Sequence, residues 1–194
     1  MFNNSGHRLG GSGKPNENTL QSLYEAINNS IPEGKSFSYW EFDIHESKDN
    51  VIFVFHDDFI VFDDEEIELS QLSFFRIKSI GNLTNVEIPT LSEIVNVLAT
   101  RDEDVMIEIK NLHSEASRKE VIEVIRGREN WCLMSTPERF IKSFPEETRS
   151  QWHNEIRGFG GSLVRVGRHR VDLFAASDSP IRWWFAKHRW FFGF

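Results

Sequence analysis

Charged side chains recur two residues apart in two separate segments of this chain. Glu41 and Asp43 form the first pair, and Glu108 is spaced in the same way from Lys110. Side chains two apart on a β-strand point to the same face. Carboxylates gathered on one face repel one another unless a cation lies between them, and hard oxygen ligands select Mg²⁺ or Ca²⁺. Glu41, Asp43 and Glu108 are therefore candidate ligands of one divalent cation, which would polarise a phosphoryl oxygen.

Two histidines lie in segments that we expect to form loops. His7 stands in a glycine-rich opening and is followed by Arg8, whereas His56 ends an apolar run. Because histidine titrates near neutral pH, one imidazole can act as a base and the other as an acid. Arg8 and Lys110 supply positive charge for a phosphate. Lys110 also suits an ion pair with Glu108, and the two uses can coexist.

Patterns of apolar residues place these side chains on strands that alternate with helices. The segments that predict strands are 37–45, 51–55, 105–110 and 131–134. The segments with helical spacing or a capped start are 20–27, 69–80, 90–98, 114–126 and 137–144. Strands alternating with helices through short connections predict an α/β fold with a parallel sheet. In a parallel barrel, the charged strand faces point inward, near the catalytic mouth.

The remaining segments show weaker patterns. Residues 63–66 are acidic and predict a solvated loop. Beyond residue 150 glycines interrupt the pattern, and 163–166 and 173–176 are candidate strands.

Length and charge limit the possible classes of protein. The 194 residues favour a single domain spanning 1–194. A (β/α)₈ barrel takes about 250 residues, or roughly 200 at the lower end, so a barrel here must be abbreviated. The formal charge of −8 argues against a nucleic-acid partner, because a phosphate backbone requires a basic surface. The single cysteine, Cys132, excludes an intramolecular disulfide, and the opening lacks the apolar run of a signal peptide, so we expect a cytoplasmic protein.

Six short motifs occur in the order found in glycerophosphodiester phosphodiesterases. They are His7-Arg8, Glu17-Asn18-Thr19, Glu41-Phe42-Asp43, His56-Asp57, Pro89-Thr90-Leu91-Ser92-Glu93 and Glu108-Ile109-Lys110. Each motif is weak alone, but six in order and at similar spacing are specific. The chain therefore resembles this family over about its first 110 residues. A fainter similarity follows at Val171-Asp172 and Asp178-Ser179-Pro180.

The resemblance implies a TIM-like (β/α) barrel, abbreviated in its C-terminal half. It implies metal-dependent hydrolysis of glycerophosphodiesters, with one Mg²⁺ or Ca²⁺ and with the substrate's own glycerol hydroxyl as nucleophile. The implied roles are acid–base catalysis by His7 and His56, phosphate binding by Arg8 and Lys110, and metal binding by Glu41, Asp43 and Glu108. We expect Glu17 to be structural, because a carboxylate at a helix start interacts favourably with the helix dipole.

Two other functions fit the same residues. A phospholipase D-like enzyme of the sphingomyelinase D type shares the twin histidines and the Glu-x-Asp pair. A non-catalytic barrel remnant fits the short C-terminal half.

The last residues, 181–194, combine aromatic and basic side chains. We favour a final barrel helix at 181–185 that buries its aromatics. The alternative is peripheral contact with a membrane surface, where Trp, Phe, Arg and Lys are common. A small-molecule or lipid-derived phosphodiester is the expected partner in both cases.

Overall fold

The structure is a computed structural model that describes residues 4–159, 162–165 and 172–188. The strands are β1 (Trp40–Glu46), β2 (Ile52–Val54), β3 (Phe59–Phe62), β4 (Glu65–Glu68), β5 (Val105–Asn111), β6 (Trp131–Met134) and β7 (Ser162–Arg165). The α-helices are α1 (Leu20–Asn28), α2 (Phe74–Leu83), α3 (Leu91–Leu98), α4 (Glu115–Ile125), α5 (Pro137–Ser143), α6 (Glu146–Gly158), α7 (Leu173–Ser177) and α8 (Pro180–His188). Two short 3₁₀ helices are η1 (Ile31–Glu33) and η2 (Leu69–Gln71).

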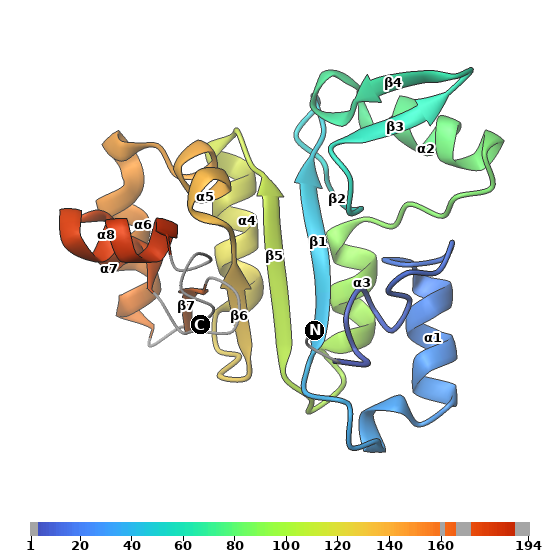
Figure 1. Cartoon of the computed structure of the whole chain (residues 1–194), viewed down its shortest axis with the longest axis horizontal. Helices are drawn as coiled ribbons and strands as arrows, with labels where there is room; N and C mark the ends of the chain where they lie inside the picture. Colours follow the sequence, from blue (N-terminus) through green and yellow to red (C-terminus); the bar gives the residue numbers. More distant parts are fainter. Residues whose placement is uncertain (1–3, 160–161, 166–171, 189–194) are drawn as a thin grey trace.

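The described strands form a five-stranded main sheet in the order β2-β1-β5-β6-β7. Strands β1, β5, β6 and β7 run parallel, whereas β2 pairs antiparallel with β1 at the edge. Figure 1 shows α1 and α3 on one side of the central strands and α4 to α8 on the other. The predicted α/β fold with a parallel sheet is confirmed. Within the described part of the chain, the sheet is open and does not close into a complete barrel.

The apolar face of β1 and β5 builds the main core. Trp40, Phe42 and Ile44 on β1, and Ile107 and Ile109 on β5, are fully buried. They pack with apolar residues of α1, α3 and α4 in one continuous cluster. Burying each such side chain stabilises the fold by about 1.5–3 kcal/mol. Because side chains alternate along a strand, this burial fixes the acidic residues on the opposite face.

Side-chain caps start the two helices that the motifs predicted. Thr19 accepts a hydrogen bond from the backbone N–H of Ser22 before α1, and the Ser22 hydroxyl lies within hydrogen-bond reach of the Thr19 N–H. Thr90 and Glu93 form the corresponding capping box before α3. Each cap stabilises its helix by about 1 kcal/mol. Both predicted helix starts are therefore confirmed.

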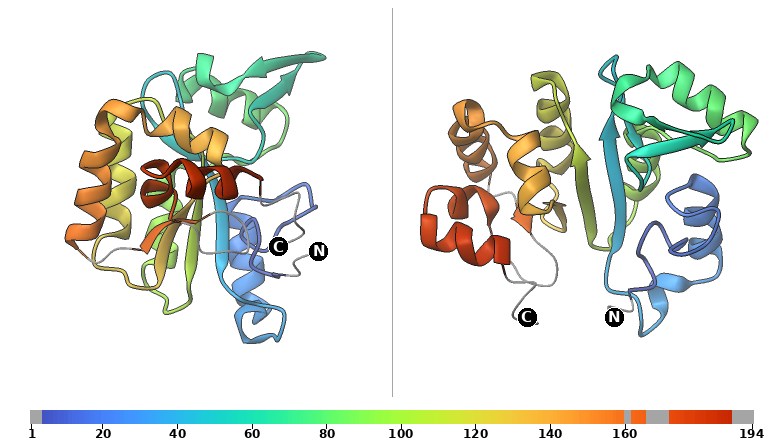
Figure 2. Two further views of the ribbon diagram at one scale, coloured as in Figure 1. Left: turned by 60° about the vertical axis from the view of Figure 1, so that its left-hand side comes forward. Right: turned by 45° about the horizontal axis from the view of Figure 1, so that its top comes forward.

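The hairpin of β3 and β4 forms a second apolar cluster with α2. Ile60, Leu69 and Ile77 are buried in this cluster, and Figure 2 shows that the hairpin and α2 lie beyond the end of β1. The predicted loop at 63–66 is solvent-exposed as expected, but only its first half is a loop, since residues 65 and 66 belong to β4. Asp63 and Asp64 form the hairpin turn with φ angles of 52° and 62°, and β4 follows at once. Asp tolerates this left-handed conformation better than most residues, which the acidic character alone did not reveal.

The predicted helix at 69–80 divides into two elements. The 3₁₀ helix η2 comes first, and α2 begins only at Phe74, where the Ser73 side chain accepts a hydrogen bond from the Arg76 N–H.

The C-terminal part contains more helix than the sequence pattern indicated. Helix α6 buries only Trp152 and Ile156, which are four residues apart, so its apolar stripe is narrow. The predicted strand at 173–176 is wrong, because Asp172 caps a helix, α7, whose Leu173 and Phe174 are buried. A window of four residues is too short to separate the strand period from the helix period. Residue 166 of the other predicted strand lies outside the described residues.

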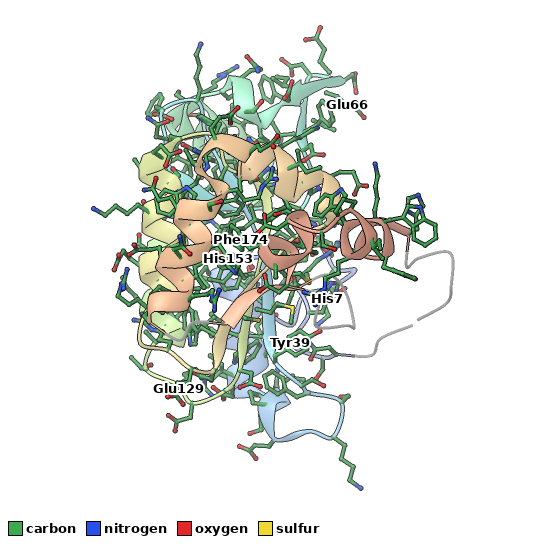
Figure 3. The ribbon with its side chains drawn as sticks, turned by 90° about the vertical axis from the view of Figure 1, so that its left-hand side faces the viewer. His7, Tyr39, Glu66, Glu129, His153 and Phe174 are labelled. Carbon is green, nitrogen blue, oxygen red and sulfur yellow. The ribbon has the colours of Figure 1, made fainter. Side chains whose placement is uncertain are left out.

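Aromatic rings join these C-terminal helices. Phe174 of α7 contacts Phe140 and Phe144 with ring centroids 4.9 and 5.0 Å apart. It also stacks on His153 of α6, as the two labelled side chains in Figure 3 show. The phenylalanine rings of this cluster belong to the main apolar core.

Helix α8 buries only part of its aromatic surface. Trp183 packs against the core and contacts Phe140, whereas Ile181, Trp184 and Phe185 are 72%, 47% and 57% exposed. The prediction of a final helix that buries its aromatics therefore holds for one of its faces. Among the described helices, none is both long enough and apolar enough to cross a membrane.

Candidate active site

Three carboxylates meet on the polar face of β1 and β5. Asp43 and Glu108 are direct neighbours in the parallel register, and Glu41 lies two residues before Asp43. One oxygen of each carboxylate lies within 4.8 Å of an oxygen of the other two. Glu41 is 2% exposed and Asp43 is 1% exposed. The structure thus brings together the three acids that the sequence analysis selected.

The electrostatics of this cluster favour a bound cation. Burial, followed by the charges of Asp43 and Glu108, raises the pKa of Glu41 well above its ordinary value. The buried Oε1 atom of Glu41 has no hydrogen-bond partner among the residues described here. A divalent ion with a preference for oxygen ligands would satisfy this atom and relieve the repulsion, so the residues present fit Mg²⁺ or Ca²⁺.

Lys110 already supplies positive charge to the cluster. Its Nζ atom lies 2.8 Å from Asp43 Oδ1 and 2.6 Å from Glu108 Oε1. Burial tends to lower the pKa of Lys110, but these two carboxylates outweigh burial and raise that pKa. The ion pair between Glu108 and Lys110, which the sequence left open beside a phosphate role, is therefore present.

The segment that carries His7 and Arg8 is a compact series of turns. Arg8 and Leu9 adopt left-handed φ angles of 50° and 57°, and Leu9 is fully buried in the main core. The Leu9 N–H donates to the carbonyl of Glu41 at 2.9 Å. Gly10 follows with a φ of 78°, where an added Cβ would lie 2.6 Å from the Ala26 side chain. Burial and backbone contacts therefore fix this segment against β1.

The guanidinium of Arg8 links this segment to the second histidine. Its Nη1 donates to Glu17 Oε1 at 2.6 Å, and its Nη2 lies 2.5 Å from Nε2 of His56. The Arg8 backbone N–H donates to Glu41 Oε2 at 2.9 Å. Glu17 is indeed structural, but the predicted reason is wrong: it precedes the first turn of α1 and holds Arg8 instead.

The two imidazoles have different partners. Nδ1 of His56 lies 2.6 Å from the Asp57 carboxylate, and a guanidinium can only donate, so Nε2 of His56 acts as the acceptor toward Arg8. His7 places Nδ1 2.8 Å from the Ser12 hydroxyl and Nε2 3.4 Å from Glu41 Oε2. Burial, and after it the charge of Arg8, lowers the pKa of His7.

Two residues beside the site were not among the functional residues predicted from the sequence. Asn18 donates from Nδ2 to Asp43 Oδ2 at 2.8 Å, although the sequence suggested only a helix cap. The Glu17-Asn18-Thr19 motif was the available signal. His45 is buried behind the site, stacks on Phe53, and has its pKa lowered to about 4 by burial.

All seven predicted site residues belong to one network of contacts. His7 reaches Glu41, Arg8 reaches Glu41, His56 and, at 3.9 Å, Asp43, and Lys110 joins Asp43 to Glu108. A parallel α/β sheet with such a site fits a phosphoric diester hydrolase. The chain belongs to the glycerophosphoryl diester phosphodiesterase family, whose sequence profile matches residues 7–147.

Solved structures show the same fold. A glycerophosphodiester phosphodiesterase from Agrobacterium tumefaciens is 19% identical, with 77% of this chain and 70% of that chain covered and a TM-score of 0.51. A glycerophosphoryl diester phosphodiesterase from Parabacteroides distasonis is 16% identical, with 92% of this chain and 59% of that chain covered and a TM-score of 0.54. No individually curated protein matches the chain in sequence.

Proposed function

We propose that the chain hydrolyses glycerophosphodiesters to an alcohol and glycerol phosphate. The family supports the reaction class, and the network of contacts around Glu41 and Arg8 supports the assignment of residues. The contact of His56 Nε2 with the Arg8 guanidinium carries the proposal, because it combines a proton acceptor with a phosphate-binding cation.

The three carboxylates are the proposed ligands of a divalent cation. Glu41, Asp43 and Glu108 would hold it, and the ion would supply charge neutralisation at a phosphoryl oxygen. Arg8 and Lys110 bring further positive charge to the same side of the sheet, where they bind the diester phosphate and orient it.

The two histidines divide the proton transfers. Nε2 of His56 takes the proton from the substrate's glycerol hydroxyl as the hydroxyl oxygen bonds to phosphorus. His7 gives a proton to the leaving alcohol oxygen as the original P–O bond breaks. Asp57 holds Nδ1 of His56, and Ser12 holds Nδ1 of His7, so each ring directs its Nε2 atom toward the site. Arg8 must release Nε2 of His56 as its guanidinium binds the phosphate, which frees that nitrogen to accept the proton. Water then opens the cyclic phosphate to glycerol phosphate.

Hydrolysis of glycerophosphocholine, which carries the glycerol hydroxyl that the mechanism requires, tests this function. The wild-type protein should release choline and glycerol phosphate from it with Mg²⁺ or Ca²⁺ but not with EDTA. His7→Ala and His56→Ala should each lose at least about 100-fold in rate. His113→Ala, which alters a half-exposed histidine outside the network, is the matched control.

Product analysis separates the alternative functions. Choline released from lysophosphatidylcholine, with no cleavage of glycerophosphocholine, would favour the sphingomyelinase D type. Absence of turnover on every diester would reject catalysis and favour a barrel remnant.

We also propose peripheral membrane contact through α8. Ile181 and Phe185 are four residues apart and exposed, and Arg182 and Lys187 flank them, a combination suited to an anionic lipid surface. Ile181→Gln/Phe185→Gln should abolish co-flotation with phosphatidylserine vesicles. The control Phe75→Gln removes a residue of α2 that is 81% exposed and should float as the wild type does. Equal flotation of all proteins, or of none, would reject the contact.

A further inference from the structure

Arg139, in the first turn of α5, contacts two segments of the active site. Its Nη1 and Nη2 atoms donate to the two carboxylate oxygens of Asp58 at 2.8 and 3.0 Å. Nη1 also donates to the backbone carbonyl of Lys110 at 3.1 Å. One guanidinium therefore joins the loop after β2 to the end of β5.

Asp58 is two residues beyond His56 in the same short loop. Asp57 already holds the His56 ring, so Asp58 is the next point at which this loop is fixed. The carbonyl of Asp58 accepts the N–H of Leu69 at 3.0 Å, which fixes the far side of the loop. The loop is thus held by Asp57 and by Leu69, and Arg139 ties it to the end of β5 through a salt bridge on one side and a hydrogen bond on the other.

We propose that Arg139 and Asp58 are positioning residues that set the place of the His56 imidazole relative to the Lys110 ammonium. This inference rests on the proposed function, in which His56 moves a proton and Lys110 binds the phosphate. Neither positioning residue touches the reacting atoms. They act through the backbone of the two segments that they join.

The geometry favours positioning over a general contribution to stability. Arg139 and Asp58 are 28% and 46% exposed, and ion pairs at such exposure contribute little to folding. Their two parallel hydrogen bonds, however, fix direction as well as distance. Partial burial tends to raise the pKa of Asp58, but the hydrogen bonds and charge of Arg139 outweigh it and lower that pKa. The pair therefore stays ionised at neutral pH.

Four variants of the full chain test the proposal. Arg139→Ala and Asp58→Asn each remove the paired contact, and the double variant removes both partners. Arg139→Lys keeps the charge but not the two-pronged contact. Arg126→Ala is the matched control, since Arg126 makes a comparable two-pronged ion pair, and its partners, Glu123 of α4 and Glu155 of α6, lie outside the site.

We expect kcat on glycerophosphocholine to fall between about 10- and 100-fold in Arg139→Ala, because a small misplacement of a catalytic group costs that much. KM and the melting temperature should stay close to those of the wild type. Asp58→Asn should lose as much kcat as Arg139→Ala, and the double variant should lose no more than either single variant. Arg139→Lys should keep more than half of the loss in log kcat that Arg139→Ala shows. Arg126→Ala should keep full kcat.

Amide hydrogen exchange over residues 55–58 gives a readout that does not depend on turnover. Exchange there should accelerate in Arg139→Ala and not in Arg126→Ala. An unchanged kcat together with unchanged exchange in Arg139→Ala would overturn the positioning role, as would strictly additive losses in the double variant. A wild-type protein without diesterase activity would reject the proposed function, whereas the exchange measurement would still decide whether Arg139 holds the loop.

Discussion

The part of the chain that carries β1 and β5 differs in kind from the part after β6. The first part buries ionisable side chains, including Glu41, Asp43 and Lys110, and it contains every described non-glycine residue with a positive φ. The later part is held by aromatic packing around Phe174. Buried charge lowers stability, and so does a left-handed backbone such as that of Arg8, whose N–H donates to Glu41. Their combination at one place indicates a functional site, supported by a region built for packing.

The substitution Glu41→Gln gives the strongest test of this contrast between the site region and the packing region. Glu41→Gln keeps the acceptor for the Arg8 N–H but removes a buried negative charge. We expect kcat/KM to fall on the order of 10³-fold through weakened cation binding. The free energy of unfolding measured in EDTA should rise, because repulsion from Asp43 and Glu108 is relieved. Glu66→Gln, on the exposed strand β4, should change neither quantity. A variant that is both active and less stable would contradict the assignment.

The opposite behaviour is expected at Phe174. Phe174→Ala empties a position that is 1% exposed and should lower the free energy of unfolding by about 3–5 kcal/mol. Turnover measured well below the melting temperature should stay within about twofold of the wild type, because the rings that contact Phe174, those of Phe140, Phe144 and His153, are not site residues. Urea denaturation and initial rates on the same preparation check both statements. A large loss of turnover in fully folded protein would show that the two regions are not separable.

Acid sensitivity should arise in the region that carries the site. Burial lowers the pKa of His45 to about 4, below its value in the unfolded chain, so the unfolded state binds the proton first as the pH falls. The resulting stability is fully present above about pH 6.5 and is lost as the pH falls toward 4, which amounts to about 2 kcal/mol between pH 7 and pH 5. Urea titrations should show a shallower pH dependence in His45→Gln than in the wild type. His113→Gln should retain the wild-type slope.

The smallest expected effect concerns Glu17. Glu17→Gln replaces a charged acceptor of Arg8 by a neutral one. The guanidinium should then hold the diester less well, and KM should rise about tenfold with little change in kcat. Substrate titrations against Glu25→Gln, an exposed residue of α1, provide the control. If kcat fell and KM did not, Glu17 would act on the chemical step and not on phosphate binding.

Sequence patterns predicted features that depend on neighbouring residues. The capping boxes at Thr19 and Thr90, the strands around Glu41 and Glu108, and the spacing of the acids all follow from local rules. The register between β1 and β5 then placed the acids together, as a parallel sheet requires.

Contacts between distant segments were not predictable in this way. Arg139 meets Asp58 across 81 residues, and Asn18 meets Asp43 across 25. Both pairs depend on how helices and loops pack, which no local period encodes. Short elements failed for another reason: α7 and the β3–β4 turn contain too few residues for their period to be read.

Leu9 has a consequence for how substrate enters. Its left-handed backbone costs about 1–2 kcal/mol, and its complete burial returns about 1.5–3 kcal/mol, so the turn is stable only while the leucine fills the core. The adjoining His7 and Arg8 cannot swing outward without emptying that position. On the proposed function, a diester would therefore meet a preformed binding surface on this side, and a gate that admits it would have to lie in other loops.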